Sequence, residues 1–163
     1  MLSRVAENLF WMARYIERAD GLARLMDQDY LMEFDGGMEG LSPEESDDYG
    51  PLETILDILA CRASWDEYSA TKPGLSAADL LHWLAFKAED GHSIRSMVTL
   101  ARENARSTQE SLSAEVWNQV NRMHLAMISR RARGRFLASP TRFLDWVKRA
   151  CVLTGGLVND TLP

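Results

Sequence analysis

Charged and aromatic side chains recur at helical spacing in the first twenty residues, MLSRVAENLFWMARYIERAD. Steps of four, three and four positions place four of them along one side of a helix: Glu7, Trp11, Arg14 and Arg18. Arg4 and Tyr15 flank this stripe. Aromatic rings that shield guanidinium groups from water would help them hold an anionic ligand. Solvated ion pairs are the alternative interpretation, and each contributes only about 0.3–0.5 kcal/mol.

A second concentration of charge lies in the segment ARENAR, residues 101–106. Arginines seven and four positions apart share one helical stripe, and they are Arg95, Arg102 and Arg106. If this helix packs beside the first, a buried network could join Glu7 to one of the last two arginines. Buried charges cost several kcal/mol unless they are paired, so such a network needs a complete set of hydrogen bonds. The spacing leaves open whether it would serve chemistry or the specificity of packing.

These two stretches supply the candidate site residues. For an anionic ligand they are Asn8, Arg14, Glu17, Arg18, Arg102, Asn104 and Arg106. As a general base the candidates are Glu7 and Glu103, and a base needs a pocket and a raised pKa. No two of the three histidines have the i, i+4 spacing of a helical metal site, and no phosphate loop, serine elbow or Cys–His pair is present. We therefore predict no metal and no cofactor.

The apolar pattern predicts the elements that position these residues. Apolar side chains alternate in steps of three and four from residue 2 onward, which predicts a helix from about Ser3 to Glu33. Residues 35–50 are rich in Gly and acidic side chains and predict a flexible acidic loop. Further helices are predicted over 51–59, 76–86, 93–105, 113–137 and 141–153, with a short helical turn at 65–68. Without any strand-period run, we expect an all-α fold, a helical bundle of about five to seven helices in one domain over residues 1–163.

Composition excludes several classes of protein. With 46% hydrophobic and 26% charged residues, the chain is neither disordered nor membrane-like, and we expect it in the cytoplasm. The net charge of −6 argues against nucleic-acid binding. The one basic run, SRRARGR at residues 129–135, fits an acidic partner better. Cys61 and Cys151 fall in apolar stretches and are expected to be reduced thiols in the core.

Three segments resemble the bacterial alpha-E domain family: RVAENLFWMARYIERAD, ARENAR, and SAEVWNQVN that begins at Ser113. The resemblance spans essentially the whole chain. Members of that family are usually longer and carry a second half that repeats this helix pattern, so the resemblance implies that the chain corresponds to their first half. Helices made to pack against the other half would expose apolar surface, and a homo-oligomer could substitute for it. The family's name implies a conspicuous glutamate, here Glu7 or Glu17.

The resemblance also implies a function. Alpha-E proteins are often encoded beside ATP-grasp ligases and transglutaminase-like proteins. The resemblance therefore implies that one of these proteins is a partner of this chain, and that the chain has a role in making or modifying peptides or amides. The leading hypothesis is an accessory or scaffold protein that binds a partner or an anionic peptide through its arginine stripes. The alternatives are an enzyme with Glu7 or Glu103 as general base, and a purely structural half-domain. The resemblance establishes the role of none of these residues.

Overall fold

The computed structural model describes residues 2–35 and 52–161, and its regular structure is helical. Eight α-helices lie in these two ranges: α1 Leu2–Asp35, α2 Leu52–Ile58, α3 Arg62–Ala70, α4 Ala77–Phe86, α5 Ile94–Ser107, α6 Ala114–Ile128, α7 Arg130–Ala138 and α8 Pro140–Thr161. A short 3-10 helix, Gln109–Ser111, connects α5 to α6. The all-α prediction is confirmed, with one helix more than the upper expectation. The predicted acidic loop lies outside the described residues, except for Asp35, which ends α1.

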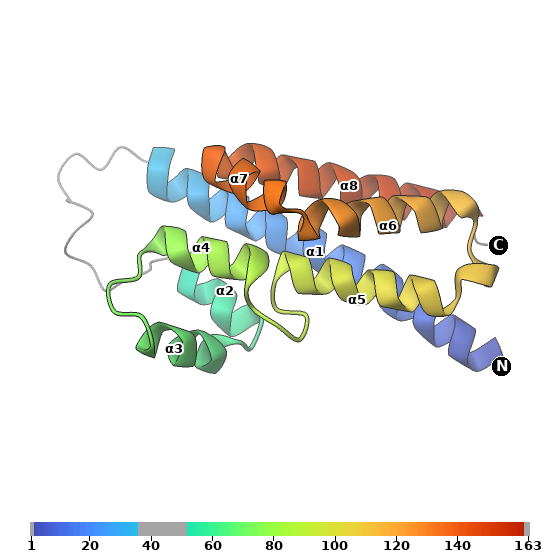
Figure 1. Cartoon of the computed structure of the whole chain (residues 1–163), viewed down its shortest axis with the longest axis horizontal. Coiled ribbons are helices and arrows are strands. Elements are labelled where there is room, and N and C mark those ends of the chain that lie inside the picture. Colours follow the sequence, from blue (N-terminus) through green and yellow to red (C-terminus); the bar gives the residue numbers. More distant parts are fainter. Residues whose placement is uncertain (1, 36–51, 162–163) are drawn as a thin grey trace.

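Four long helices form an antiparallel bundle (Figure 1). α1 packs along both α5 and α8, while α6 contacts α5 and α8. The chain reverses direction from α1 to α5, from α5 to α6, and again before α8. The short helices α2 to α4 lie at one end of the bundle, where α2 contacts α1 and α4 contacts α5. The two helices that carry the charged stripes are therefore neighbours, as the prediction of a network required.

The first helix forms because its apolar residues make one continuous buried stripe. Its buried side chains recur at steps of three and four, and they are Met12, Ile16, Ala19, Leu22, Ala23 and Met26. Fully burying a side chain as large as Leu22 or Met26 stabilises a fold by roughly 1.5–3 kcal/mol. The predicted long N-terminal helix is confirmed.

Two serine caps set the register of the helices that follow. The Ser76 amide donates to Asp79 Oδ2 at 2.9 Å at the start of α4, and the Ser96 amide donates to Ser93 Oγ at 3.1 Å at the start of α5. Ser93 is fully buried, and its hydroxyl also donates to the Ala88 carbonyl at 2.6 Å. The cap therefore ties α5 to the end of α4, and this fixes which residues of α5 face α1 and which face α6.

The prediction of one helix over residues 113–137 is wrong, because the chain breaks at Ser129. That residue is extended, with φ −66° and ψ 148°, and it separates α6 from α7. After the break, Phe136 packs edge-to-face on Phe86 and Phe143, with ring centroids 5.6 and 5.5 Å apart. A continuous helix would carry Phe136 past these rings. Packing of the aromatic side chain therefore overrides the local helical pattern.

Two further boundaries differ from the prediction. The turn expected at residues 65–68 is the longer helix α3, in which Trp65 is buried and lies 5.4 Å from the Trp83 ring. α8 continues through Gly155 and Gly156 to Thr161, whereas the sequence predicted a helix only as far as residue 153. Each glycine costs a helix about 1 kcal/mol. The helix nevertheless continues past Thr154, which is buried, while α8 packs along α1.

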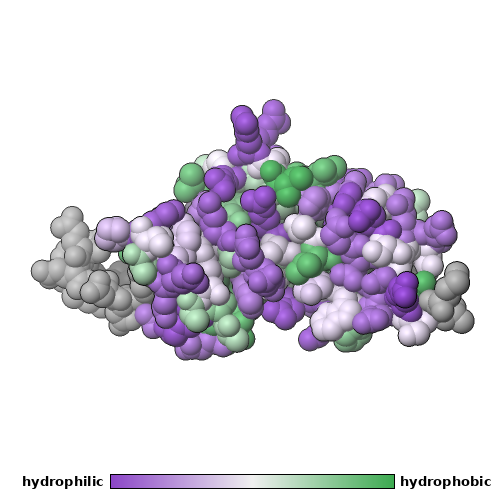
Figure 2. All heavy atoms as spheres, turned by 60° about the horizontal axis from the view of Figure 1, so that its bottom comes forward, coloured by the Kyte–Doolittle hydropathy of each residue, from purple (hydrophilic) through white to green (hydrophobic). Residues whose placement is uncertain are grey.

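The surface of the bundle mixes polar and apolar groups. On the face shown in Figure 2, hydrophobic residues occur in small patches interrupted by hydrophilic ones. Large apolar side chains that are exposed include Phe10 on α1 and Val152 on α8. Among the described helices, none has an apolar stretch long enough to cross a membrane. Cys61 and Cys151 are both buried and unpaired, as expected of core thiols.

Candidate functional site

Within the described ranges, the charged residues of the stripe on α1 do not contact one common partner or ligand site. Arg14 Nη1 lies 2.7 Å from Glu17 Oε2, and both side chains are more than half exposed, at 52% and 64%. This is a solvated pair within one helix turn, which matches the alternative interpretation for these two residues. Glu7 is also exposed, and among the described residues it forms no ion pair.

Arg18 instead reaches a different part of the chain. Its Nη2 donates to the carbonyl oxygen of Gly91 at 3.3 Å, in the connection between α4 and α5. Tyr15 packs against the same glycine, because a Cβ built on Gly91 would lie 3.4 Å from Tyr15 Cε1. The Tyr15 ring lies 5.9 Å from the ring of Trp11. Arg18 and Tyr15 of α1 therefore both contact the α4–α5 connection, and the Trp11 ring lies beside Tyr15.

The arginines of ARENAR share one carboxylate. Glu103 Oε1 lies 2.6 Å from Arg102 Nη1, and Glu103 Oε2 lies 3.0 Å from Arg106 Nη2. Arg102 also donates from Nε to Asn121 Oδ1 at 3.3 Å, and its guanidinium lies 5.7 Å from the Trp117 ring. Both of these partners belong to α6. Arg102 thus turns toward α6, and within the described residues neither Arg102 nor Arg106 pairs with Glu7, although α1 and α5 pack together.

This cluster is half exposed and strongly paired. The Glu103 side chain is 44% exposed, so the network is not the buried one that the sequence made conceivable. Hydrogen bonds from Arg102 and Arg106 lower the pKa of Glu103 below its ordinary value. Burial and the nearby charge of Arg102 lower the pKa of His124, whose Nδ1 is buried without a hydrogen-bond partner. A carboxylate with a lowered pKa is a weak base, which disfavours Glu103 in that role.

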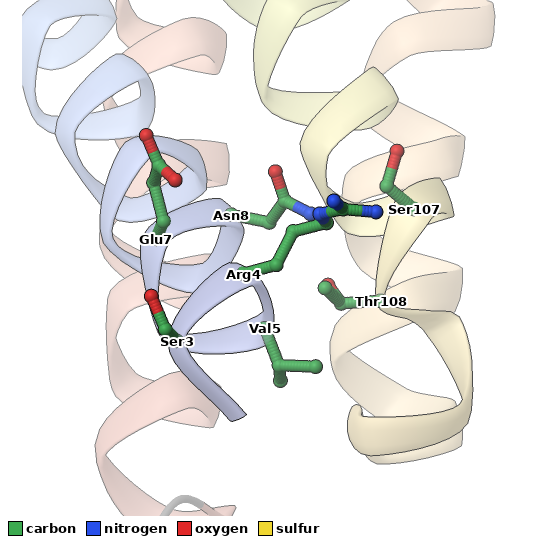
Figure 3. A pocket seen from close by; sticks show the side chains of 7 residues that line it. All are labelled: Ser3, Arg4, Val5, Glu7, Asn8, Ser107 and Thr108. Atoms are coloured by element: carbon green, nitrogen blue, oxygen red, sulfur yellow. The ribbon is translucent and has the colours of Figure 1, made fainter. Parts of the chain in front are cut away.

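A cavity of about 510 Å³ opens between the start of α1 and the end of α5. Its lining residues are Ser3, Arg4, Val5, Glu7, Asn8, Ser107 and Thr108. Figure 3 shows that Arg4 and Asn8 point from α1 toward α5, while Glu7 lies on the other side of α1. Of the predicted residues, the structure brings Asn8 and Glu7 to this cavity, and Arg4 joins them.

Some polar side chains of this cavity already donate hydrogen bonds within the chain, and others are free to bind a ligand. Ser107 Oγ donates to the Glu103 carbonyl at 3.0 Å, and the buried Thr108 hydroxyl donates to the Asn104 carbonyl at 3.1 Å. The Arg4 guanidinium forms no ion pair or hydrogen bond with any residue in the described ranges, and neither does the Asn8 amide. An unpaired guanidinium beside an unpaired amide can bind a carboxylate or another oxyanion.

Sequence reasoning named Arg4 only as a neighbour of the stripe. Arg4, Asn8, Trp11, Tyr15 and Arg18 follow one another at steps of four, three, four and three, and that register was the available signal. Asn104, which was predicted to bind a ligand, donates its Nδ2 to the Leu100 carbonyl of its own helix at 2.8 Å. No group of three or more metal-ligating side chains occurs in the parts of the chain that the structure describes.

Comparison with known proteins places the chain in a family. The family model of Alpha-E, described as a predicted alpha-helical domain with a conserved ER motif, matches residues 1–163. No curated protein and no solved structure matches the chain. The sequence contains one Glu-Arg dipeptide, Glu17–Arg18, and its two side chains diverge, one toward Arg14 and the other toward Gly91. With the all-helical fold and a match over its whole length, the chain belongs to the Alpha-E family.

Proposed function

We propose that this Alpha-E domain is a non-catalytic binding domain that works with an ATP-grasp-type peptide or amide ligase. In this role it holds an anionic group of a partner protein or peptide in the cavity between α1 and α5. The link to a ligase rests on the family resemblance, and the anionic chemistry rests on the side chains of the cavity.

The observation that carries this proposal is that the Arg4 guanidinium has no partner among the residues that the structure describes. Four of the five arginines in the two stripes are engaged within the chain: Arg14 with Glu17, Arg18 with the Gly91 carbonyl, and Arg102 and Arg106 with Glu103. The fifth, Arg95, lines a different cavity. Arg4 points into a cavity that also offers the Asn8 amide (Figure 3). A carboxylate placed there would accept hydrogen bonds from both side chains, and bonds to a charged donor contribute about 1.5–3 kcal/mol each.

The two proposed general bases fit catalysis less well than binding. Glu103 is held by two arginines and has a lowered pKa. Glu7 lines the cavity, but its carboxylate is exposed and lies on the far side of α1 from Asn8 (Figure 3). The negative charge of Glu7 would repel an anionic ligand that approaches from its side of α1. Glu7 would therefore restrict binding to ligands that approach from the α5 side.

Binding of a glutamate-rich peptide tests the anionic site. We expect hexaglutamate to bind in calorimetry at low salt, and Arg4→Gln to weaken binding at least tenfold. Arg14→Gln is the matched control, because it removes the same charge from the same helix without touching the cavity. Equal losses in the two variants would mean that only net charge matters and would reject the site.

Association with a ligase needs a separate measurement. The domain and the ATP-grasp ligase of the same genome are co-expressed, and the tagged domain is purified. We expect the ligase to co-purify with the wild type and with Arg14→Gln, and to be lost with Arg4→Gln. Failure of the wild type to retain the ligase would contradict the proposed partner. A purely structural role would instead predict that Arg4→Gln lowers the melting temperature and leaves all binding unchanged.

A further inference from the structure

A second cavity, of about 480 Å³, lies where the α4–α5 connection, α5 and α7 meet. Three cationic side chains from three different elements line it: Lys87 directly after α4, Arg95 in the first turn of α5, and Arg133 on α7. The last belongs to the basic run SRRARGR, for which the proposed function has no use.

Aromatic packing holds two of these cations at the cavity. Phe86 and Phe136 pack edge-to-face at 5.6 Å, and both are buried. Lys87 follows the first of these rings, and Arg133 lies one helical turn before the second. The contact between the rings therefore fixes the backbone positions from which both cations extend.

None of the three cations forms an ion pair with any residue in the described ranges, unlike Arg14, Arg102 and Arg106. Two of them, Lys87 and Arg133, also lie near His82. Besides burial, the charges of Arg133 and Lys87 lower the pKa of His82 on α4, and Asp79 acts in the opposite direction. Two of the three cations thus act on the same side chain of α4, and Asp79 offsets part of their effect.

Two carboxylates also line the cavity, and both Glu89 and Asp90 are exposed. With three cations and two carboxylates, the lining carries a net charge of +1. The Ser96 and Thr99 hydroxyls donate to backbone carbonyls, at 3.0 and 2.8 Å, so the cations are the principal free donors. These carboxylates oppose an anion and should weaken its binding.

We propose that the cavity between α4, α5 and α7 binds a phosphate group through Lys87, Arg95 and Arg133. Three cations that extend from three elements suit the three oxygens of a terminal phosphate, whereas a carboxylate offers only two. The site uses none of the residues of the α1–α5 cavity, so it stands independently of the proposed function.

Pyrophosphate is the probe that tests this site, measured by calorimetry at low salt. We expect Arg95→Gln and Arg133→Gln each to weaken binding about tenfold. Arg131→Gln is the matched control, because it removes the same charge from α7 at an exposed position that does not line the cavity. Glu89→Gln should tighten binding, since it removes a repelling charge. If Arg95→Gln does not fold, as judged by its thermal melt, Lys87→Gln replaces it.

Titration of the His82 ring gives a second, independent measurement of phosphate binding in the same protein. Bound phosphate would screen His82 from Arg133 and Lys87, so we expect the pKa of His82, followed by NMR, to rise when pyrophosphate is added. Equal binding by Arg133→Gln and Arg131→Gln, or an unchanged His82 titration, would overturn the site. Malonate that binds as tightly as pyrophosphate would overturn the phosphate assignment. Arg4→Gln should leave pyrophosphate binding unchanged, and this separates the two cavities.

Discussion

Arg18 donates a hydrogen bond from Nη2 to the carbonyl oxygen of Gly91, across 73 positions of sequence. The bond joins α1 to the connection between α4 and α5. Glu17, the other half of the only Glu-Arg dipeptide, bonds Arg14 within its own helix. The two residues of the dipeptide therefore have unequal structural roles.

Substitution of the two residues should show this inequality in stability. Arg18→Ala removes a half-buried bond between elements and should lower the free energy of unfolding by about 1 kcal/mol. Glu17→Gln breaks only an exposed pair and should cost at most about 0.5 kcal/mol. Urea denaturation of both variants measures the difference. A larger loss for Glu17→Gln would contradict this account and would indicate a role for Glu17 that the fold does not explain.

A side chain at Gly91 should lower the stability of the fold. Its φ is +78°, and a Cβ there would lie 3.4 Å from both Leu100 Cδ1 and Tyr15 Cε1. Backbone strain and crowding together predict that Gly91→Ala costs about 1–3 kcal/mol. Gly74→Ala is the control, since it has φ +81° with nothing within 4 Å of the Cβ. Thermal unfolding should show Gly91→Ala as the more damaging change, and equal losses would mean that only the backbone conformation matters.

The ion pair between Lys148 and Asp27 joins α8 to α1. Its N···O distance is 2.7 Å, and the side chains are only 18% and 13% exposed. Lys148→Met should lower stability by about 3 kcal/mol, because Asp27 would keep a nearly buried charge without a partner. Chemical denaturation of the single variants and of Lys148→Met with Asp27→Asn completes a double-mutant cycle. We expect the double variant to be more stable than the sum of the single changes implies, and simple additivity would exclude coupling.

Cys151 should make stability fall at alkaline pH. Burial, together with the charge of Asp20, raises the pKa of its thiol to about 12. An unfolded thiol ionises near pH 9, so the folded state retains its proton longer. The contribution of Cys151 is complete below pH 9 and is lost as the pH rises toward 12, by up to about 1.4 kcal/mol per pH unit. Cys151→Ala should lose less stability between pH 8 and about 10. Rapid reaction of native Cys151 with a thiol reagent at pH 8 would contradict its burial.

The sequence was sufficient to predict the fold where local pattern and burial agree. The stripe from Met12 to Met26 repeats at helical steps and is buried in the structure. Ser76 and Ser93 were expected to begin helices, and both act as caps. The break at Ser129 could not be predicted in this way. Its cause is the contact of Phe136 with rings on α4 and α8, and no local pattern contains that contact.

The candidate site was less predictable than the helices that carry it. Helical spacing shows that Arg102 and Arg106 share a face, but it does not show which neighbour that face meets. The structure turns Arg102 toward Asn121 and Trp117 of α6, while Arg106 pairs with Glu103 of its own helix. Arg4 became a candidate binding residue only because it lines a cavity with Ser107 and Thr108, which lie more than 100 residues away in sequence. Contacts between distant segments decided both outcomes.

The break at Ser129 also selects among the arginines that follow it. Each residue of a helix turns the chain by about 100°, so the corner sets the angular phase of α7, and the Phe136 ring locks it. With this phase, Arg133 lines the cavity, while the exposed Arg130, Arg131 and Arg135 lie outside its lining. One residue inserted between Arg135 and Phe136 would rotate Arg133 out of the cavity without changing the composition of the basic run. The number of residues between the break at Ser129 and the Phe136 ring therefore determines the lining of this cavity as much as the arginines themselves do.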